Sequence, residues 1–109
     1  MDASAAQRLI DELETWPEVT FAEGRFHSTR FLVGRRELGH VHGSGILDMP
    51  LPKPLKAELI ERGKAIPHRY TPPNSGWVTI ELDDEPAVER ALVLLRERYE
   101  HARELQAAS

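Results

Sequence analysis

The sequence contains no cysteine. This absence excludes a disulfide framework, a thiolate nucleophile and sulfur ligands for zinc or iron–sulfur clusters. Any catalysis would therefore use histidine, carboxylate, arginine, serine or tyrosine side chains.

An excess of positive charge is also missing, because 18 acidic residues outnumber 14 basic ones and give a formal net charge of -4. A protein that neutralises phosphates carries a positive field over its binding face. We therefore do not expect nucleic acid as a partner. The basic residues are nevertheless uneven, since Arg25, Arg30, Arg35 and Arg36 lie close together along the chain and leave a local anion site open.

Long apolar runs are absent as well. Residues 1–16 carry Asp11, Glu12 and Glu14, and they contain no apolar run long enough for a signal peptide or a membrane span. We therefore predict a cytoplasmic protein with no membrane partner. A chain of 109 residues that is 40% hydrophobic and 29% charged is expected to form a single domain, residues 1–109, around one core.

Hydrophobic spacing, capping residues and turn residues predict the order helix, four strands, helix, strand, helix. The expected elements are a helix over 6–16, strands at 19–21, 26–33, 37–42 and 46–49, a helix over 52–62, a strand at 77–82 and a last helix from 83 to about 105. Tight turns between the early strands exclude a doubly wound parallel sheet. The sequence thus predicts an α+β fold with an antiparallel or mixed sheet of about five strands and helices packed mainly on one face.

Two histidines in the third expected strand are the first candidates for chemistry. Residues two apart in a strand point to the same side, so His40 and His42 should share one face with Leu38, and Gly39 and Val41 should occupy the other. Such a pair can chelate a divalent metal, bind an anion when protonated, or act as a base beside an acid.

A metal at this pair would need a third ligand, for which Asp48 and His68 are the candidates. Two histidines and one carboxylate would suit non-haem iron. Strand histidines are more commonly solvated or hydrogen-bonded, so we predict no bound metal and no other cofactor. Asp48 could instead orient a histidine, or cap the chain as it enters the following helix.

Two turns flank this region. Ser75 and Gly76 precede Trp77, whose indole offers a flat wall and one N–H donor to an aromatic ligand, or simply packs in the core. Arg35 and Arg36, followed by Glu37, could clamp a carboxylate, phosphate or enolate, although such a trio is more often a solvated turn.

Several of these residues belong to an ordered series of short motifs. The series comprises residues 31–43 (FLVGRRELGHVHG), 48–50 (DMP), 63–65 (GKA) with His68, and 75–78 (SGWV). It resembles the luciferase-like domain family, which takes its name from the fungal luciferases and includes many small bacterial proteins. The likeness extends over about residues 26–103.

The resemblance implies a reaction for the fungal members, which oxidise a hydroxylated styrylpyrone with molecular oxygen and release carbon dioxide and light, with no flavin or metal known to be required. It also implies that the family's shared site includes Glu37, His40, His42, Asp48, His68 and Trp77. Residues 77–99 are in addition similar to the closing portion of small bacterial double-wing proteins suspected of DNA binding.

We therefore predict a small aromatic or anionic ligand in a pocket lined by histidine and tryptophan, with cofactor-independent oxygenase or acid–base chemistry. The expected catalytic residues are His40, His42, His68 and Asp48, and the expected ligand-binding residues are Arg35, Arg36, Glu37, Ser75 and Trp77. The alternatives are a non-enzymatic binding or interaction module and a double-wing-like nucleic-acid binder. A monomer or a homodimer paired through a sheet edge is expected.

Overall fold

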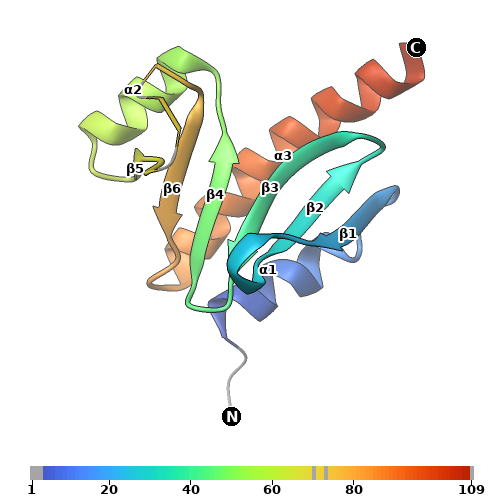
Figure 1. Cartoon of the computed structure of the whole chain (residues 1–109), viewed down its shortest axis with the longest axis horizontal. Coiled ribbons are helices and arrows are strands. Elements are labelled where there is room, and N and C mark those ends of the chain that lie inside the picture. The colour runs from blue at the N-terminus through green and yellow to red at the C-terminus, as the bar shows by residue number, and fades with distance from the viewer. Residues whose placement is uncertain (1–3, 70, 73, 109) are drawn as a thin grey trace.

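The computed structural model describes residues 4–69, 71–72 and 74–108. The helices are α1 (Ala5–Leu13), α2 (Lys53–Glu61) and α3 (Glu85–Ala108), and a short 3-10 helix, η1, covers Arg25–His27. The strands are β1 (Val19–Glu23), β2 (Thr29–Val33), β3 (Arg36–His42), β4 (Ile46–Pro50), β5 (Ile66–Pro67) and β6 (Trp77–Glu81). They form a sheet in the order β1-β2-β3-β4-β6-β5, and every neighbouring pair is antiparallel (Figure 1).

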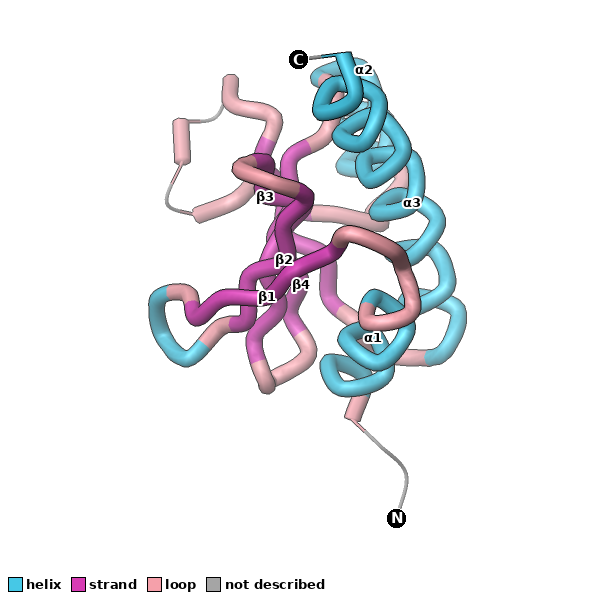
Figure 2. The backbone as a smooth tube through the Cα atoms, turned by 90° about the vertical axis from the view of Figure 1, so that its right-hand side faces the viewer, coloured by secondary structure: helices cyan, strands magenta, loops and turns pink. Residues whose placement is uncertain are grey.

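The helices α1 and α3 pack against the same face of this sheet (Figure 2). The core between them contains alternate side chains from the strands, such as Phe31, Val41 and Leu47, which are at most 2% exposed. Burial of these apolar side chains is the main force that holds helices to sheet. The opposite face of the sheet carries the polar side chains of β3, β4 and β6.

The long helix α3 carries one apolar stripe toward the sheet. Its Tyr99 is fully buried, packs against Trp16 with ring centroids 5.1 Å apart and planes tilted by 46°, and donates a hydrogen bond to the carbonyl oxygen of Pro17. This contact connects the chain after α1 to the middle of α3. No helix in the described part of the chain is both long and apolar enough to cross a bilayer.

The predicted α+β class, the antiparallel sheet and the one-sided helices are confirmed, with one strand more than expected. The additional strand β5 has only two residues and pairs with β6 through Ile66 and Pro67. It lies in a stretch rich in proline, where a sequence pattern indicates a loop. β6 therefore has a neighbour on both sides.

The first hairpin also differs from the prediction, because Phe26, His27 and Ser28 are not part of a strand. Phe26 and His27 have positive φ angles of 56° and 59°, and they lie in η1 between β1 and β2. The connection is closed by a hydrogen bond from the backbone N–H of Gly24 to the carbonyl oxygen of Ser28. Aromatic content made this segment resemble a strand, although its backbone turns.

A bulge in β3 changes which side chains share a face. Phe31 pairs with Gly39 while the next residue, Leu32, pairs with Glu37, so Leu38 is an extra residue on β3. Leu38 is completely buried in the core. The prediction that Leu38 would accompany the two histidines is therefore wrong, because a bulge reverses the alternation at that point.

Candidate functional site

The polar cluster lies on the face of the sheet opposite α1 and α3. His40 and His42 point from β3 to this face, and Asp48 points from β4, where it is the direct cross-strand partner of His40. His68 follows β5, and its backbone N–H donates to the carbonyl oxygen of Trp77 at 3.4 Å. Two neighbouring strands and one loop therefore bring these side chains together.

One carboxylate oxygen is the centre of the cluster. The Nε2 atoms of His40, His42 and His68 lie 3.1, 3.2 and 3.5 Å from Oδ2 of Asp48. The other oxygen, Oδ1, accepts a 2.6 Å hydrogen bond from the hydroxyl of Thr79 on β6. Because the Asp48 side chain is only 7% exposed, these four residues are its main environment on this face.

A second carboxylate supports His40 from the other side of its ring. Oε2 of Glu37 lies 3.2 Å from Nδ1 of His40, and Oε1 of Glu37 forms an ion pair with Nε of Arg30 on β2. The bulge at Leu38 allows this contact, since it turns Glu37 to the same face as His40. Both ring nitrogens of His40 therefore face a carboxylate.

The ring of Trp77 forms one side of the cluster. Its centroid lies 5.5 Å from that of His40 with the planes tilted by 32°, and 5.9 Å from that of His68. The two histidine rings are themselves nearly perpendicular, with centroids 6.4 Å apart. An indole face beside two imidazoles is a suitable surface for an aromatic ligand.

These contacts shift two pKa values in opposite directions. Burial disfavours ionisation of Asp48, but hydrogen bonds from His40 and Thr79 and the charges of nearby histidines outweigh it and lower the pKa to about 2. The hydrogen bond to Asp48 raises the pKa of His40 against the effect of burial, and Glu37 raises it further. The cluster thus favours a carboxylate next to an imidazolium.

The loop before β6 is held in place by backbone contacts and one buried lysine. The carbonyl oxygen of Gly76 accepts a 2.8 Å hydrogen bond from the N–H of Leu51, and a Cβ on Gly76 would lie 2.5 Å from the Leu51 carbonyl oxygen. Nζ of Lys56 donates to the carbonyl oxygen of Ser75. Only glycine permits this close approach of the two backbones, which fixes the start of β6 and so the position of Trp77.

The structure brings together most of the predicted site residues, namely His40, His42, His68, Asp48, Glu37 and Trp77. Ser75 stands nearby in the loop, but its hydroxyl bonds to the hydroxyl of Thr71 and accepts from the N–H of Trp77. The contacts of Ser75 therefore stabilise the loop that precedes β6.

The predicted arginines lie elsewhere. Arg35 is in the exposed turn between β2 and β3, and Arg36 pairs with Val33, whose side chain is buried under the helices. Burial lowers the pKa of Arg98 in α3, and the charge of Arg36 lowers it further, which places Arg36 toward the helix side. The structure does not bring this pair to the histidines.

Sequence reasoning did not connect three residues with the histidine cluster: Arg30, which was noted only as one of a group of arginines, Thr79 and Lys56. Arg30 is the cross-strand partner of His40, and Thr79 is that of Asp48, so strand register alone would have placed both beside the cluster. Lys56 is 7% exposed, although lysine is almost never fully buried unless it has a partner.

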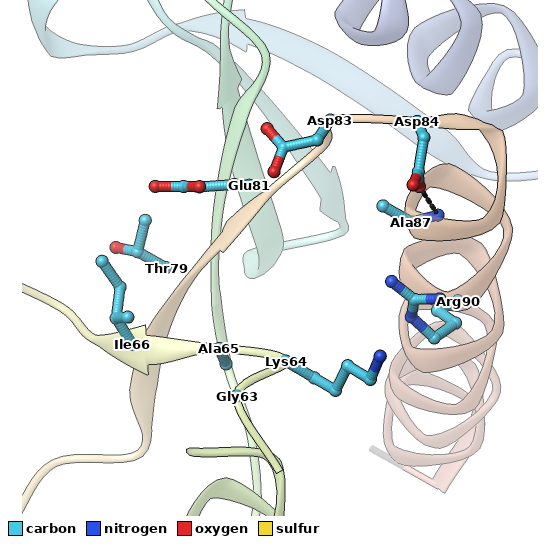
Figure 3. A pocket seen from close by; sticks show the side chains of 10 residues that line it. All are labelled: Gly63, Lys64, Ala65, Ile66, Thr79, Glu81, Asp83, Asp84, Ala87 and Arg90. Carbon is cyan, nitrogen blue, oxygen red and sulfur yellow. Dashed lines mark hydrogen bonds between the residues drawn. The ribbon is translucent and has the colours of Figure 1, made fainter. Parts of the chain in front are cut away.

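A separate hollow of about 190 Å3 lies between the β5–β6 edge and the start of α3 (Figure 3). Its charged lining consists of Lys64, Glu81, Asp83, Asp84 and Arg90. Ligand pockets usually measure roughly 300–1,000 Å3, so this hollow is small. It shares Thr79 with the cluster.

Donor atoms of His40, His42 and Asp48 lie within 4.8 Å of one another, a spacing at which three ligands can hold one metal ion. The same set can also act without a metal, because a histidine that contacts a carboxylate is a ready proton acceptor or donor. The arrangement therefore supports acid–base chemistry, anion binding and metal binding.

The model of the luciferase domain family matches residues 35–98. This range includes the three histidines, Asp48 and their contacts Glu37, Thr79 and Trp77, and it begins after Arg30. The match covers more than half of the chain, and the chain belongs to the luciferase domain family. No curated protein and no solved structure matches the chain significantly.

Proposed function

We propose that this luciferase-domain protein binds a small aromatic or anionic molecule on the polar face of its sheet and moves a proton to or from it. The observation that supports this proposal is the convergence of three imidazoles on one buried carboxylate beside an indole. An aromatic ring would lie against Trp77, and an acidic group of the ligand would face the histidines.

His40 is best placed for the proton transfer. Asp48 and Glu37 contact its two ring nitrogens and fix the orientation of the ring, as carboxylates do for catalytic histidines. His42 and His68 each contact the same oxygen of Asp48. A ligand that displaces one of them from Asp48 would gain a proton donor or acceptor.

Oxygen chemistry would follow from the same step if the ligand is enolisable. Removal of a proton by a histidine leaves an electron-rich enolate, and positive charge nearby stabilises that anion. Such an enolate can react with molecular oxygen without a cofactor, which is the class of reaction that the family resemblance implies. The substrate class therefore proposed is an enolisable or phenolic aromatic molecule.

Partner and location are parts of the same proposal. A cysteine-free sequence suits the cytoplasm, where thiols are kept reduced and disulfides do not contribute. The acidic net charge disfavours nucleic acid as the ligand. We propose a cytoplasmic monomer or homodimer acting on a small molecule.

The test uses the two tryptophans as separate reporters in protein treated with EDTA. Trp16 is 7% exposed and packs on Tyr99 on the helix side, so a Trp16→Phe variant reports only on Trp77. Titration with a hydroxylated aromatic carboxylate and with a 4-hydroxy-2-pyrone should quench Trp77 in this variant. The Trp77→Phe variant should show no such change.

His40→Ala should abolish the quenching, and His101→Ala should not, because His101 is exposed on α3 away from the cluster. Quenching of equal size in the Trp77→Phe variant, or no response to either probe up to millimolar concentration, would contradict the proposal. That result would favour the non-enzymatic reading, in which the polar network only fixes the loop before β6.

A further inference from the structure

We propose that His40, His42, His68 and Asp48 form a binding site for a single divalent transition-metal ion. This proposal does not depend on the small-molecule ligand described above. It rests on the positions of four donor atoms, on the number of contacts that one carboxylate oxygen makes, and on the residues that hold the donors in place.

The distances from the carboxylate to the three histidines are those of a tetrahedral site, and the donor atoms of His40, His42 and Asp48 lie within 4.8 Å of one another. In such a site metal–nitrogen and metal–oxygen bonds of roughly 2.1 Å place neighbouring donor atoms about 3.4 Å apart. The distances from Oδ2 of Asp48 to Nε2 of His40, His42 and His68 are 3.1, 3.2 and 3.5 Å. Three edges of a coordination tetrahedron that meet at the carboxylate oxygen therefore already have the right length.

Hydrogen bonding alone accounts poorly for this arrangement. A carboxylate oxygen has about two lone-pair sites, yet three ring nitrogens approach Oδ2 of Asp48, two from β3 and one from the loop after β5. Oδ1 is already engaged by Thr79. A cation between the four donors would satisfy Oδ2 and all three nitrogens together, with the rings neutral.

The surroundings resemble the outer layer of known metal sites. A histidine that binds a metal usually donates its other ring N–H to a carboxylate, which fixes the ring and strengthens the ligand. Nδ1 of His40 lies 3.2 Å from Oε2 of Glu37, and Arg30 holds the other oxygen of that carboxylate. Thr79 similarly holds Asp48 with Oδ2 directed at the histidines.

The donor set selects the class of ion. Three imidazoles and one carboxylate favour zinc, iron, copper or nickel over magnesium and calcium, which prefer oxygen ligands. The side chains of His40, His42 and His68 are 21%, 23% and 13% exposed, so solvent reaches this face. A small molecule beside Trp77 could then place an oxygen on the ion, and the metal would supply the positive charge otherwise carried by a protonated histidine.

The test is a metal titration of tag-free protein that has been treated with EDTA and freed of the chelator. Co2+ should bind with one equivalent per chain and give the strong visible absorption of a four-coordinate ion. Zn2+ should displace it, with the affinity read by competition against a chromophoric chelator.

His42→Ala and Asp48→Asn should each weaken Zn2+ binding by at least about 100-fold, the upper end of the loss seen when only a supporting residue is removed. His27→Ala and His101→Ala are matched controls, because they remove the two histidines outside the cluster, and they should bind like the wild type. Circular dichroism of the metal-free variants checks that each is folded, and His42, at 23% exposure, is the most exposed of the three histidines.

Two results would overturn the proposal. One is a folded His42→Ala variant that binds Zn2+ as tightly as the wild type, and the other is binding only at millimolar concentration or with the absorption of a fully hydrated ion. The tryptophan titrations in EDTA are independent of these results. If the wild type binds no metal but shows the ligand-induced quenching of Trp77, the metal site alone is rejected. If it binds the metal but shows no quenching, the small-molecule site alone is rejected.

Discussion

Nε2 of His40 lies 3.1 Å from Oδ2 of Asp48 because the two residues are directly opposite each other in the β3–β4 ladder. A contact between cross-strand neighbours depends on strand register and not on a flexible loop. The central pair of the site is therefore as rigid as the sheet that carries it.

This pair should make the stability of the metal-free protein depend on pH at both ends. The pKa of Asp48 falls from 3.8 to about 2 on folding, so its contribution, about 2 kcal/mol, is present above pH 3.8 and lost as the pH falls toward 2. The pKa of His40 is raised above 6.5, so its contribution is present below pH 6.5 and lost as the pH rises through the folded pKa.

The measurement is the difference in free energy of unfolding between wild type and Asp48→Asn, from urea titrations at a series of pH values in EDTA. The difference should be largest between about pH 4 and 6.5 and should shrink on both sides. A difference that is constant from pH 3 to pH 8 would contradict this reading of the pair.

The same substitution should lower the pKa of His40 itself. The hydrogen bond to Asp48 is the largest cause of the raised pKa of His40. Without the Asp48 carboxylate, burial lowers this pKa and only Glu37 opposes that effect. Histidine ring proton shifts followed by NMR against pH would measure this change, with exposed His101 as the internal reference. An unchanged pKa would show that Glu37 alone controls His40.

Glu37→Gln should weaken Zn2+ binding by about 10-fold to 100-fold, because it removes the charge that supports His40 without removing a ligand. Arg30→Gln should have a smaller effect in the same direction, since Arg30 contacts only Glu37 in the described site. Competition titrations of Zn2+ give both values. Equal affinity in Glu37→Gln and wild type would mean that Glu37 does not support the metal site through His40.

Gly39→Ala should destabilise the fold by about 1–3 kcal/mol, the usual cost of overpacking. Its Cβ would lie 2.8 Å from the carbonyl oxygen of Asp48 and 3.1 Å from Cβ of Met49. Gly43→Ala is the matched control, because no atom lies within 4 Å of the Cβ position there. Urea denaturation of both variants should therefore separate them, and equal midpoints would be inconsistent with the tight β3–β4 packing.

Lys56→Met should lower the free energy of unfolding by about 1.5–3 kcal/mol, the range for a hydrogen bond with a charged partner. The change keeps the length and apolar stem of a buried side chain but removes the donor to the carbonyl oxygen of Ser75. Faster hydrogen exchange at Trp77 should accompany it. A loss of stability without that local change would place the role of Lys56 elsewhere.

Much of the site could be predicted because its key residues are visible in short motifs. The spacing of His40 and His42 gives a shared face in any regular strand, and Asp48, His68 and Trp77 were candidates from their residue types before the family resemblance included them. The helices could also be predicted, since apolar periodicity and the proline and glycine at their ends do not depend on distant contacts.

The errors came from features that only tertiary pairing decides. Leu38 looked like a regular strand residue, and nothing local indicates that β3 has one more residue than β2 at that point. The partners Arg30 and Thr79 could be recognised only once the register was known. Phe26 is an aromatic residue of the kind favoured in strands, but it lies in the five-residue connection in which the chain turns from β1 to β2.

The extra residue in β3 has a consequence for protein engineering. A designer who grafts the His-x-His segment with Asp48 onto another antiparallel sheet would obtain the inner contacts from regular pairing alone. Glu37 would then project to the wrong side unless the irregularity at Leu38 is transplanted as well. The smallest segment that could transfer the site is therefore the bulged strand β3 together with β4. A regular strand would reproduce the contacts with Asp48 but not the contact between Glu37 and His40.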